Sequence, residues 1–192
     1  MKQNKAIIVM DYINEIVHPD GKFKGKGYAD FCKENNVIEN VVDAVANMRE
    51  SGGYVIYVKI SFEENYSDLP KNSVLFEKAP IFNALQKNTW ATEFHESLDV
   101  RVSDFVAIKN RISPFSNPQL EDFLKSNNIT DLYLAGVATD LVVQSAARDA
   151  HDKDYSVCVL SDCCGAGNMV DHKAALNNLE KFVRVSTYKN LF

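Results

Sequence analysis

The stretch Ala6-Ile7-Ile8-Val9-Met10-Asp11 decides the fold class of this chain. Its first five residues are all apolar, without the alternation of a strand that faces water on one side. Such a run is typical of a strand covered on both faces, as in a parallel sheet. Comparable runs recur along the chain and predict six strands, at 6–11, 54–60, 105–109, 132–136, 156–160 and 182–186.

Helical patterns fill the gaps between these strands. Apolar residues recur at helical spacing within 35–50, and Gly52-Gly53 ends that pattern. Further amphipathic stretches lie at 120–124, 139–151 and 174–179. Strands that alternate with helices imply right-handed crossovers, so the sequence predicts a three-layer, Rossmann-like α/β fold with a central six-stranded parallel sheet.

The composition fits one soluble globular domain over residues 1–192. The chain has 46% hydrophobic and 24% charged residues, an ordinary balance for a protein with a full core. Its net charge of −5, with no cluster of Lys or Arg, argues against a nucleic-acid partner. No apolar run is long enough to span a bilayer, and the first residues lack the pattern of a secretory signal. We therefore expect a cytoplasmic protein that binds a small molecule, with neither nucleic acid nor membrane as a partner.

The spacing of cysteines and histidines argues against a metal site or a disulfide framework. No C-x-x-C pair occurs, and the histidines are scattered. In a reducing compartment the cysteines are expected to be free thiols. Because no metal-binding spacing occurs, we expect neither a metal nor a cofactor. The residues concerned are Cys32, Cys158, Cys163, Cys164, His18, His95, His151 and His172.

One segment, 61–102, interrupts the alternation. It separates the second and third strands by about forty residues and contains Trp90, Phe62, Phe76 and Phe94. Disordered segments are poor in aromatic residues, so we interpret 61–102 as a partly helical insertion that covers a pocket.

Polar residues stand at three strand ends where such folds bind ligands. Asp11 ends the first strand, Lys109 ends the third, and Thr139-Asp140 follows the fourth at the start of a helix. Ligands of open α/β sheets bind beyond the carboxyl ends of the strands, so these groups would share one crevice. Each also has a plain structural interpretation, as a turn residue, a solvated lysine or a helix cap. Spacing alone therefore supports either an enzyme or a small-molecule binder.

Over its whole length the chain resembles the isochorismatase-like hydrolase superfamily, which is rich in cysteine hydrolases. The resemblance is carried by Ile7-Ile8-Val9-Met10-Asp11, Asn88-Thr89-Trp90-Ala91-Thr92-Glu93, Ile108-Lys109-Asn110-Arg111 and Leu134-Ala135-Gly136-Val137-Ala138-Thr139-Asp140. The segments Ser145-Ala146-Ala147-Arg148-Asp149-Ala150 and Ser161-Asp162-Cys163-Cys164 also fit. It implies a six-stranded parallel sheet with helices on both faces, and a homo-oligomer, either a dimer or a tetramer.

The resemblance also implies a catalytic set of Asp, Lys and Cys, of which this chain lacks the last. The Asp matches Asp11, the Lys matches Lys109, and the position of the Cys is Val142. Valine has no nucleophilic atom, so a thiolate route through an acyl-enzyme is closed. Cys163 and Cys164 follow the predicted fifth strand and are the nearest substitutes, although family members commonly carry a non-catalytic cysteine at the position of Cys164.

Three functions remain open from the sequence. In the first, which the resemblance to the isochorismatase branch implies, Asp11 is paired with Lys109 and acts as a general acid in vinyl-ether hydrolysis. That branch also lacks the cysteine. Alternatively, Asp11 acts as a general base that activates water against an amide or ester. In the third case the chain is a non-catalytic relative that binds a small molecule. An amidase that uses another nucleophile is a further, weaker alternative.

The resemblance extends to the pocket itself. It implies a cis peptide at Val137–Ala138, with the backbone around Val137, Ala138 and Val142 directed at an oxyanion or a water. Ile13 stands where the family often has Gln, which makes the pocket less polar. Candidate substrate-binding residues are Phe62, Trp90, Arg111 and Phe115, with Arg111 and Lys59 as the nearest partners for a substrate carboxylate.

Overall fold

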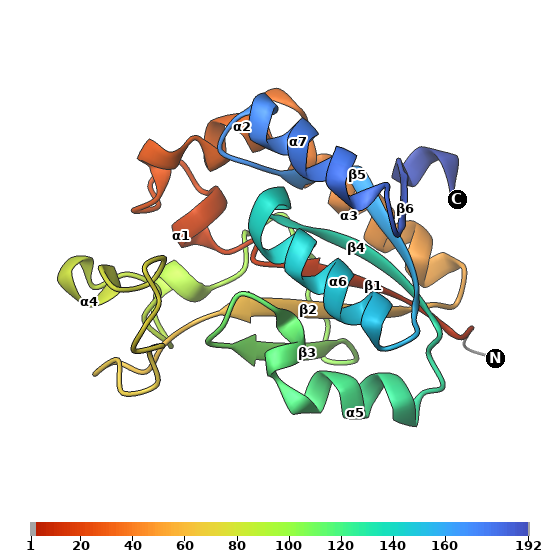
Figure 1. Ribbon diagram of the computed structural model, residues 1–192, viewed down its shortest axis with the longest axis horizontal. Helices are drawn as coiled ribbons and strands as arrows, with labels where there is room; N and C mark the ends of the chain where they lie inside the picture. The colour runs from red at the N-terminus through yellow and green to blue at the C-terminus, as the bar shows by residue number, and fades with distance from the viewer. Residues whose placement is uncertain (1–2, 192) are drawn as a thin grey trace.

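The computed structural model describes residues 3–191 and confirms the predicted fold class (Figure 1). Six strands form one parallel sheet in the order β3-β2-β1-β4-β5-β6. From β1 the chain winds outward to β2 and β3, and from β4 it winds the other way to β5 and β6. The direction therefore reverses between β1 and β4. The strands are β1 Lys5–Met10, β2 Tyr54–Ile60, β3 Phe105–Lys109, β4 Asp131–Val137, β5 Ser156–Gly165 and β6 Arg184–Ser186.

Helices cover both faces of the sheet, as the alternating pattern predicts. One face carries α2 (Tyr28–Glu34) and α3 (Val37–Glu50), and the other carries α5 (Pro118–Ser126), α6 (Gln144–Asp152) and α7 (Met169–Leu179). Two short helices, α1 (Asn14–Val17) and α4 (Ala79–Phe82), lie beyond the carboxyl ends of the strands. Single 3-10 turns form at Lys24–Lys26, Trp90–Thr92, Pro114–Ser116 and Tyr188–Asn190.

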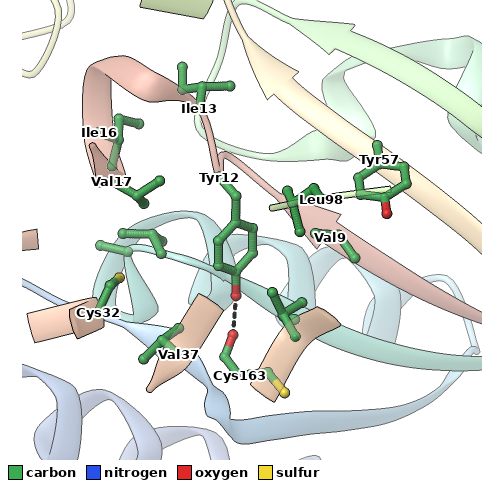
Figure 2. Packing of buried hydrophobic residues seen from close by; sticks show 14 of the residues in the cluster. Val9, Tyr12, Ile13, Ile16, Val17, Cys32, Val37, Tyr57, Leu98 and Cys163 are labelled. Carbon is green, nitrogen blue, oxygen red and sulfur yellow. Dashed lines mark hydrogen bonds between the residues drawn. The ribbon is translucent and has the colours of Figure 1, made fainter. Parts of the chain in front are cut away.

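The central strands are apolar throughout because both of their faces are buried. In β1, Ile7 and Val9 pack toward α3, whereas Ile8 and Met10 pack toward α5 and α6, and all four are fully buried. Figure 2 shows part of the first of these two cores, where the hydroxyl of Tyr12 donates a hydrogen bond to the carbonyl of Cys163. Burial of this kind contributes about 25 cal/mol per Å² of apolar surface and holds the sheet between its helices.

Two cysteine placements predicted from the sequence are wrong. Cys163 and Cys164 lie inside β5 and not after it, because an irregularity in the pairing with β4 lets β5 continue to Gly165. Cys32 lies in α2. All four cysteines are buried free thiols, and burial raises the pKa of Cys32 and Cys164 to about 12. They are therefore unionised and unavailable as nucleophiles.

The helix predicted at 139–151 is two pieces. It begins with a π-helical turn, Thr139–Val143, and continues as α6. Thr139 is not the N-cap, since that position belongs to Ala138, whose side chain cannot cap. Turns of this type are rare and occur mainly at functional sites.

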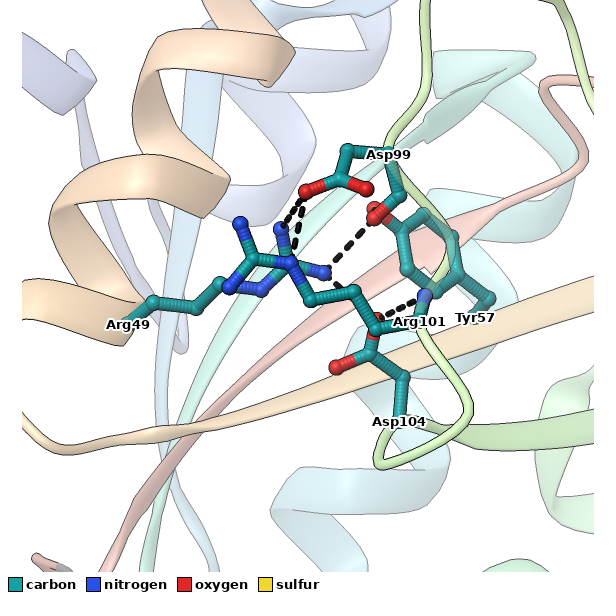
Figure 3. Close-up of polar contacts among 5 residues, drawn as sticks. All are labelled: Arg49, Tyr57, Asp99, Arg101 and Asp104. Carbon is teal, nitrogen blue, oxygen red and sulfur yellow. Dashed lines mark hydrogen bonds and ion pairs between the residues drawn. The ribbon is translucent and has the colours of Figure 1, made fainter.

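The segment 61–102 forms turns, α4 and one 3-10 helix, and α4 lies beyond the carboxyl ends of the strands, at the left of Figure 1. The last residues of the segment run back along the sheet, where Asp99 meets Tyr57 of β2 and Arg49 of α3. Its end is fastened to α3 by an ionic cluster. Arg49 donates to the carbonyl and the carboxylate of Asp99 and to the carboxylate of Asp104, and Arg101 pairs with Asp99 (Figure 3). Among the described residues, the helices are all too short or too polar to cross a bilayer.

Candidate active site

The ends of β1 and β3 bring a carboxylate and an ammonium into contact. Lys109 Nζ lies 2.7 Å from Asp11 Oδ2, and the two side chains are 1% and 5% exposed. Asp11 Oδ1 accepts a hydrogen bond of 2.8 Å from the N–H of Ile60, at the end of the intervening strand β2. Lys109 also donates to the carbonyl of Arg111 at 3.2 Å. Three neighbouring segments therefore hold this pair in one geometry.

Asp11 has the left-handed backbone conformation, with φ of 63°. Few residues other than glycine adopt it, and Asp and Asn tolerate it best. Its N–H donates to the carbonyl of Val58 at 2.8 Å, so the chain turns directly after β1 while staying tied to β2. This turn directs the carboxylate toward β3 and Lys109.

Burial controls the ionisation of Asp11. Removal from water raises the pKa of this carboxyl above its ordinary value of 3.8, although Lys109 and the N–H of Ile60 act in the opposite direction. A carboxyl with a raised pKa exchanges protons closer to neutral pH than an exposed aspartate does. That property suits a general acid or base.

The pair opens onto a cavity of about 90 Å³ at the point where the winding of the sheet reverses. Parallel α/β sheets bind ligands at this position. Asp11 and Lys109 are the charged lining residues within the described chain, and Tyr28 is the other lining residue with a polar side chain. The remaining wall is apolar and consists of Ile16, Phe23, Ile60, Leu75, Phe76, Leu85, Ile112, Val137, Ala138, Leu141 and Val142.

Five predicted site residues meet in this cavity. Asp11 and Lys109 are joined there by Val137 and Ala138, at the end of β4, and by Val142 of the π-helical turn. Val142 is 2% exposed, so its methyl groups form part of a closed wall. The peptide bond Val137–Ala138 is cis, which confirms the geometry that the resemblance implies.

The four predicted substrate-binding residues lie elsewhere. Phe62 is fully buried behind the wall, against Phe76, with ring centroids 5.3 Å apart. Trp90 is 46% exposed and contacts the edge of His18. Phe115 packs near Tyr155 on the face of the sheet that carries α5 and α6. Arg111 donates to the carbonyls of Asp68 and Asn110, at 3.3 and 2.8 Å.

The wall uses other residues, and of these the sequence analysis named Phe76, within the insertion expected to cover a pocket. Leu75, Phe76 and Leu85 come from the segment 61–102, Phe23 directly precedes the 3-10 turn Lys24–Lys26, and Tyr28 is the first residue of α2. Leu75, Leu85, Phe23 and Tyr28 stand in stretches for which the apolar pattern predicts neither a helix nor a strand.

Glu15 positions both of these wall segments. It is 1% exposed, and its two carboxylate oxygens accept from the N–H of Lys22 at 3.2 Å and the N–H of Leu85 at 2.9 Å. Its own carbonyl accepts from the N–H of Phe23. The signal was present in the sequence, since Glu15 is an acidic residue between the apolar pairs of 12–13 and 16–17.

A second buried contact anchors the π-helical turn. Thr139 Oγ1 donates to the carbonyl of Gly165 at 2.9 Å, so His172 Nδ1, also at 2.9 Å, is the donor to Thr139. Burial lowers the pKa of His172, which favours the neutral ring. Within residues 3–191, no group of three His, Cys, Asp or Glu side chains converges as metal ligands do.

The chain matches a known family model and a curated relative over most of its length. The family model for the isochorismatase domain matches residues 5–190. The ureidoacrylate amidohydrolase RutB of Acinetobacter baylyi is 30% identical over 193 aligned residues, which cover 94% of this chain and 78% of that protein.

Solved structures share the fold over nearly the whole chain. An isochorismatase-like hydrolase from Alkaliphilus metalliredigens superposes with a TM-score of 0.81 at 25% identity and covers 100% of this chain and 97% of its own. An isochorismatase family protein from Desulfovibrio vulgaris has a TM-score of 0.86 at 19% identity, with coverages of 99% and 97%.

Proposed function

The chain belongs to the isochorismatase family of hydrolases, and from this premise we propose that it hydrolyses an amide or ester bond of a small molecule with water as the nucleophile. Asp11 is the general base and Lys109 is its partner. The observation that carries the proposal is the buried Asp11–Lys109 pair, which opens onto a cavity whose wall includes Val142.

The proposed reaction needs no side-chain nucleophile. The Asp11 carboxylate takes a proton from water while the water oxygen forms a bond to the carbonyl carbon. The negative charge that develops on the carbonyl oxygen is met by the backbone N–H groups of Ala138 and Val142. When the bond to the leaving amine or alcohol breaks, Asp11 returns the proton to it. Lys109 orients the carboxylate and favours its ionised form, in opposition to the effect of burial.

Two observations favour this reaction over vinyl-ether hydrolysis of isochorismate. Isochorismate carries two carboxylates, and Arg111 and Lys59 were the cations expected to meet them. Arg111 donates to backbone carbonyls, and Lys59 donates to the carbonyl of Thr92 at 2.8 Å, so both have other partners. In addition, the relative that is 30% identical is named as an amidohydrolase.

The second candidate is a non-catalytic protein that binds a small molecule. It is favoured by Val142, since a buried apolar side chain occupies the place of the nucleophile. The two candidates differ in what Asp11 does. In an enzyme Asp11 transfers protons, whereas in a binding protein it contributes only a hydrogen-bond acceptor or a charge.

Turnover of a panel of amides and esters separates the candidates. We expect Asp11→Asn to reduce kcat/KM by roughly 100-fold or more, the usual contribution of a general base. Circular dichroism must show that the variant is folded, since Asn leaves Lys109 without its counter-charge. Absence of turnover with every compound, or turnover that Asp11→Asn leaves unchanged, would overturn the catalytic proposal.

Val142→Cys tests whether the rest of the machinery is intact. A thiol at this position lies in the first turn of a helix and lines the same cavity as Asp11 and Lys109. The helix N-terminus and the ammonium of Lys109 favour a thiolate, and Asp11 accepts the thiol proton. We expect amidase activity above that of wild type, with an initial burst of amine as the acyl-enzyme accumulates. A folded Val142→Cys protein without this burst would indicate that the backbone N–H groups are not arranged to hold an oxyanion. The cytoplasmic location and the homo-oligomeric state stay predictions.

A further inference from the structure

The electrostatics and size of the cavity restrict the substrate class. Asp11 and Lys109 are the charged lining residues within the described chain, and they neutralise each other at 2.7 Å. Apart from Tyr28, the other lining side chains are apolar. A ligand in this space therefore meets one internally balanced ion pair and an otherwise hydrocarbon surface.

The two basic residues that the sequence offered as carboxylate partners, Arg111 and Lys59, do not line this cavity. The guanidinium of Arg111 is held by the carbonyls of Asp68 and Asn110. The ammonium of Lys59 is held by the carbonyl of Thr92 and lies 5.3 Å from the ring centre of Phe94. A substrate carboxylate in the cavity would lose its hydration without gaining a cation, which is strongly unfavourable.

The volume sets a second limit. An apolar cavity of roughly 150 Å³ accommodates benzene, and the space here is about 90 Å³. Ile60, Leu85 and Val142 border it on separate segments of the chain, so on their side it cannot deepen without moving a strand, the segment 61–102 or the π-helical turn. The reacting portion of the substrate is therefore short.

From these features we infer that the substrate is an uncharged amide or ester with a short aliphatic acyl chain, of roughly four carbons. This inference rests on the hydrolysis proposed above and concerns the same cavity. The acyl chain packs against Ile60, Leu85 and Val142, and its carbonyl carbon lies beside Asp11. Substrates that carry a carboxylate on the acyl chain are rejected.

A matched pair of compounds tests the inference. Butyramide and succinamate have the same number of carbon atoms, and in succinamate a carboxylate replaces the terminal methyl group. Ammonia release from each is measured with the wild-type protein. We expect kcat/KM for butyramide to exceed that for succinamate by roughly 100-fold or more, because the carboxylate is buried without a partner. Preference for succinamate would overturn the inference and leave the proposed hydrolysis standing.

A charge introduced into the wall should reverse the preference. Ile112 is a partly buried lining residue, so Ile112→Arg or Ile112→Lys supplies the missing cation. We expect the preference to move toward succinamate by at least about 10-fold. Ile81→Arg is the matched control, since Ile81 is 72% exposed on α4 and should leave the preference unchanged. An equal shift in the control, or none in either folded Ile112 variant, would contradict the assignment.

If neither butyramide nor succinamate is hydrolysed, calorimetric titration of the wild-type protein with both compounds separates the inferred ligand class from the proposed hydrolysis. Binding of butyramide but not succinamate would retain the inferred ligand class and overturn the hydrolysis. Binding of succinamate alone, or of neither compound, would overturn both.

Discussion

At the scale of single residues, the Asp11–Lys109 pair governs both ionisation and stability. Its charges are 2.7 Å apart and almost fully buried, so each compensates for the lost hydration of the other. Position 11 also has a left-handed backbone, which Asn tolerates as well as Asp does. Asp11→Asn is therefore the conservative way to remove the charge.

Removing one charge of the pair should cost more stability than removing both. Asp11→Asn leaves the ammonium of Lys109 buried alone, and breaking a buried pair in this way costs about 3–5 kcal/mol. Asp11→Asn combined with Lys109→Met replaces the ammonium by an apolar side chain of similar length. We expect its free energy of unfolding, measured by urea denaturation, to lie above that of the single variant. A double variant less stable than Asp11→Asn would contradict this account.

The raised pKa of Asp11 predicts the acid limb of the pH–rate profile. A general base works only when it is ionised, so kcat/KM rises as pH increases through the pKa of Asp11 in the free enzyme. Burial raises that pKa, so the midpoint should lie above the 3.8 of an ordinary aspartate. A profile that is flat down to pH 4 would indicate that another group carries the proton.

At the scale of elements, two buried side chains hold the cavity wall in place. Glu15 on α1 joins the turn at Lys22 to the segment 61–102 at Leu85. His172 on α7 joins the π-helical turn through Thr139. The Glu15–Leu85 and Thr139–His172 contacts join segments that are distant in sequence, so each ties the position of one element to another.

Glu15→Gln should loosen the segment that carries Leu85. A carboxylate accepts from both N–H groups, but the glutamine side chain has one carbonyl oxygen, so one buried N–H is left without an acceptor. The expected cost is about 1–3 kcal/mol, with faster hydrogen exchange at the amide of Leu85 or Lys22. Glu63→Gln is the matched control in the same segment, because Glu63 is half exposed and its pair with Lys87 contributes little. Equal exchange in the two variants would argue against the role of Glu15.

His172 should make stability depend on pH in the mildly acidic range. Its pKa is lower in the folded protein than the 6.5 of a free histidine, so the unfolded chain binds more protons below that pH. Stability is therefore lost as pH falls through 6.5 and below. His172→Asn keeps a donor to Thr139 without a titrating ring. Thermal unfolding from pH 7 to 5 should show a smaller decline in this variant, and an equal decline would exclude His172 as a source.

At the scale of the whole molecule, the ionic cluster of Figure 3 fastens the end of 61–102 to α3, at the edge of the sheet opposite the cavity. Asp104 is 7% exposed in its side chain and depends on Arg49, whereas the side chains of Arg101 and Asp99 are more than half exposed. Arg49→Met should destabilise the protein by about 1–3 kcal/mol, because it leaves a buried carboxylate without a cation. Arg101→Ala should stay within about 1 kcal/mol of wild type. Urea denaturation of both variants checks the difference, and equal losses would contradict it.

The sequence by itself determined the sheet, the helical layers and the three chain positions at the centre of the site. Burial on both faces leaves a continuous apolar run, helices leave a periodic one, and strand ends locate Asp11, Lys109 and Thr139-Asp140, whereas Val142 was identified through the family resemblance. Only the tertiary structure decided which residues wall the cavity, where β5 ends and that Arg111 is directed away. Those features depend on contacts between segments without periodicity, such as the hydrogen bond between Glu15 and Leu85. Local patterns of apolar residues predict helices and strands but do not predict which distant residues will meet.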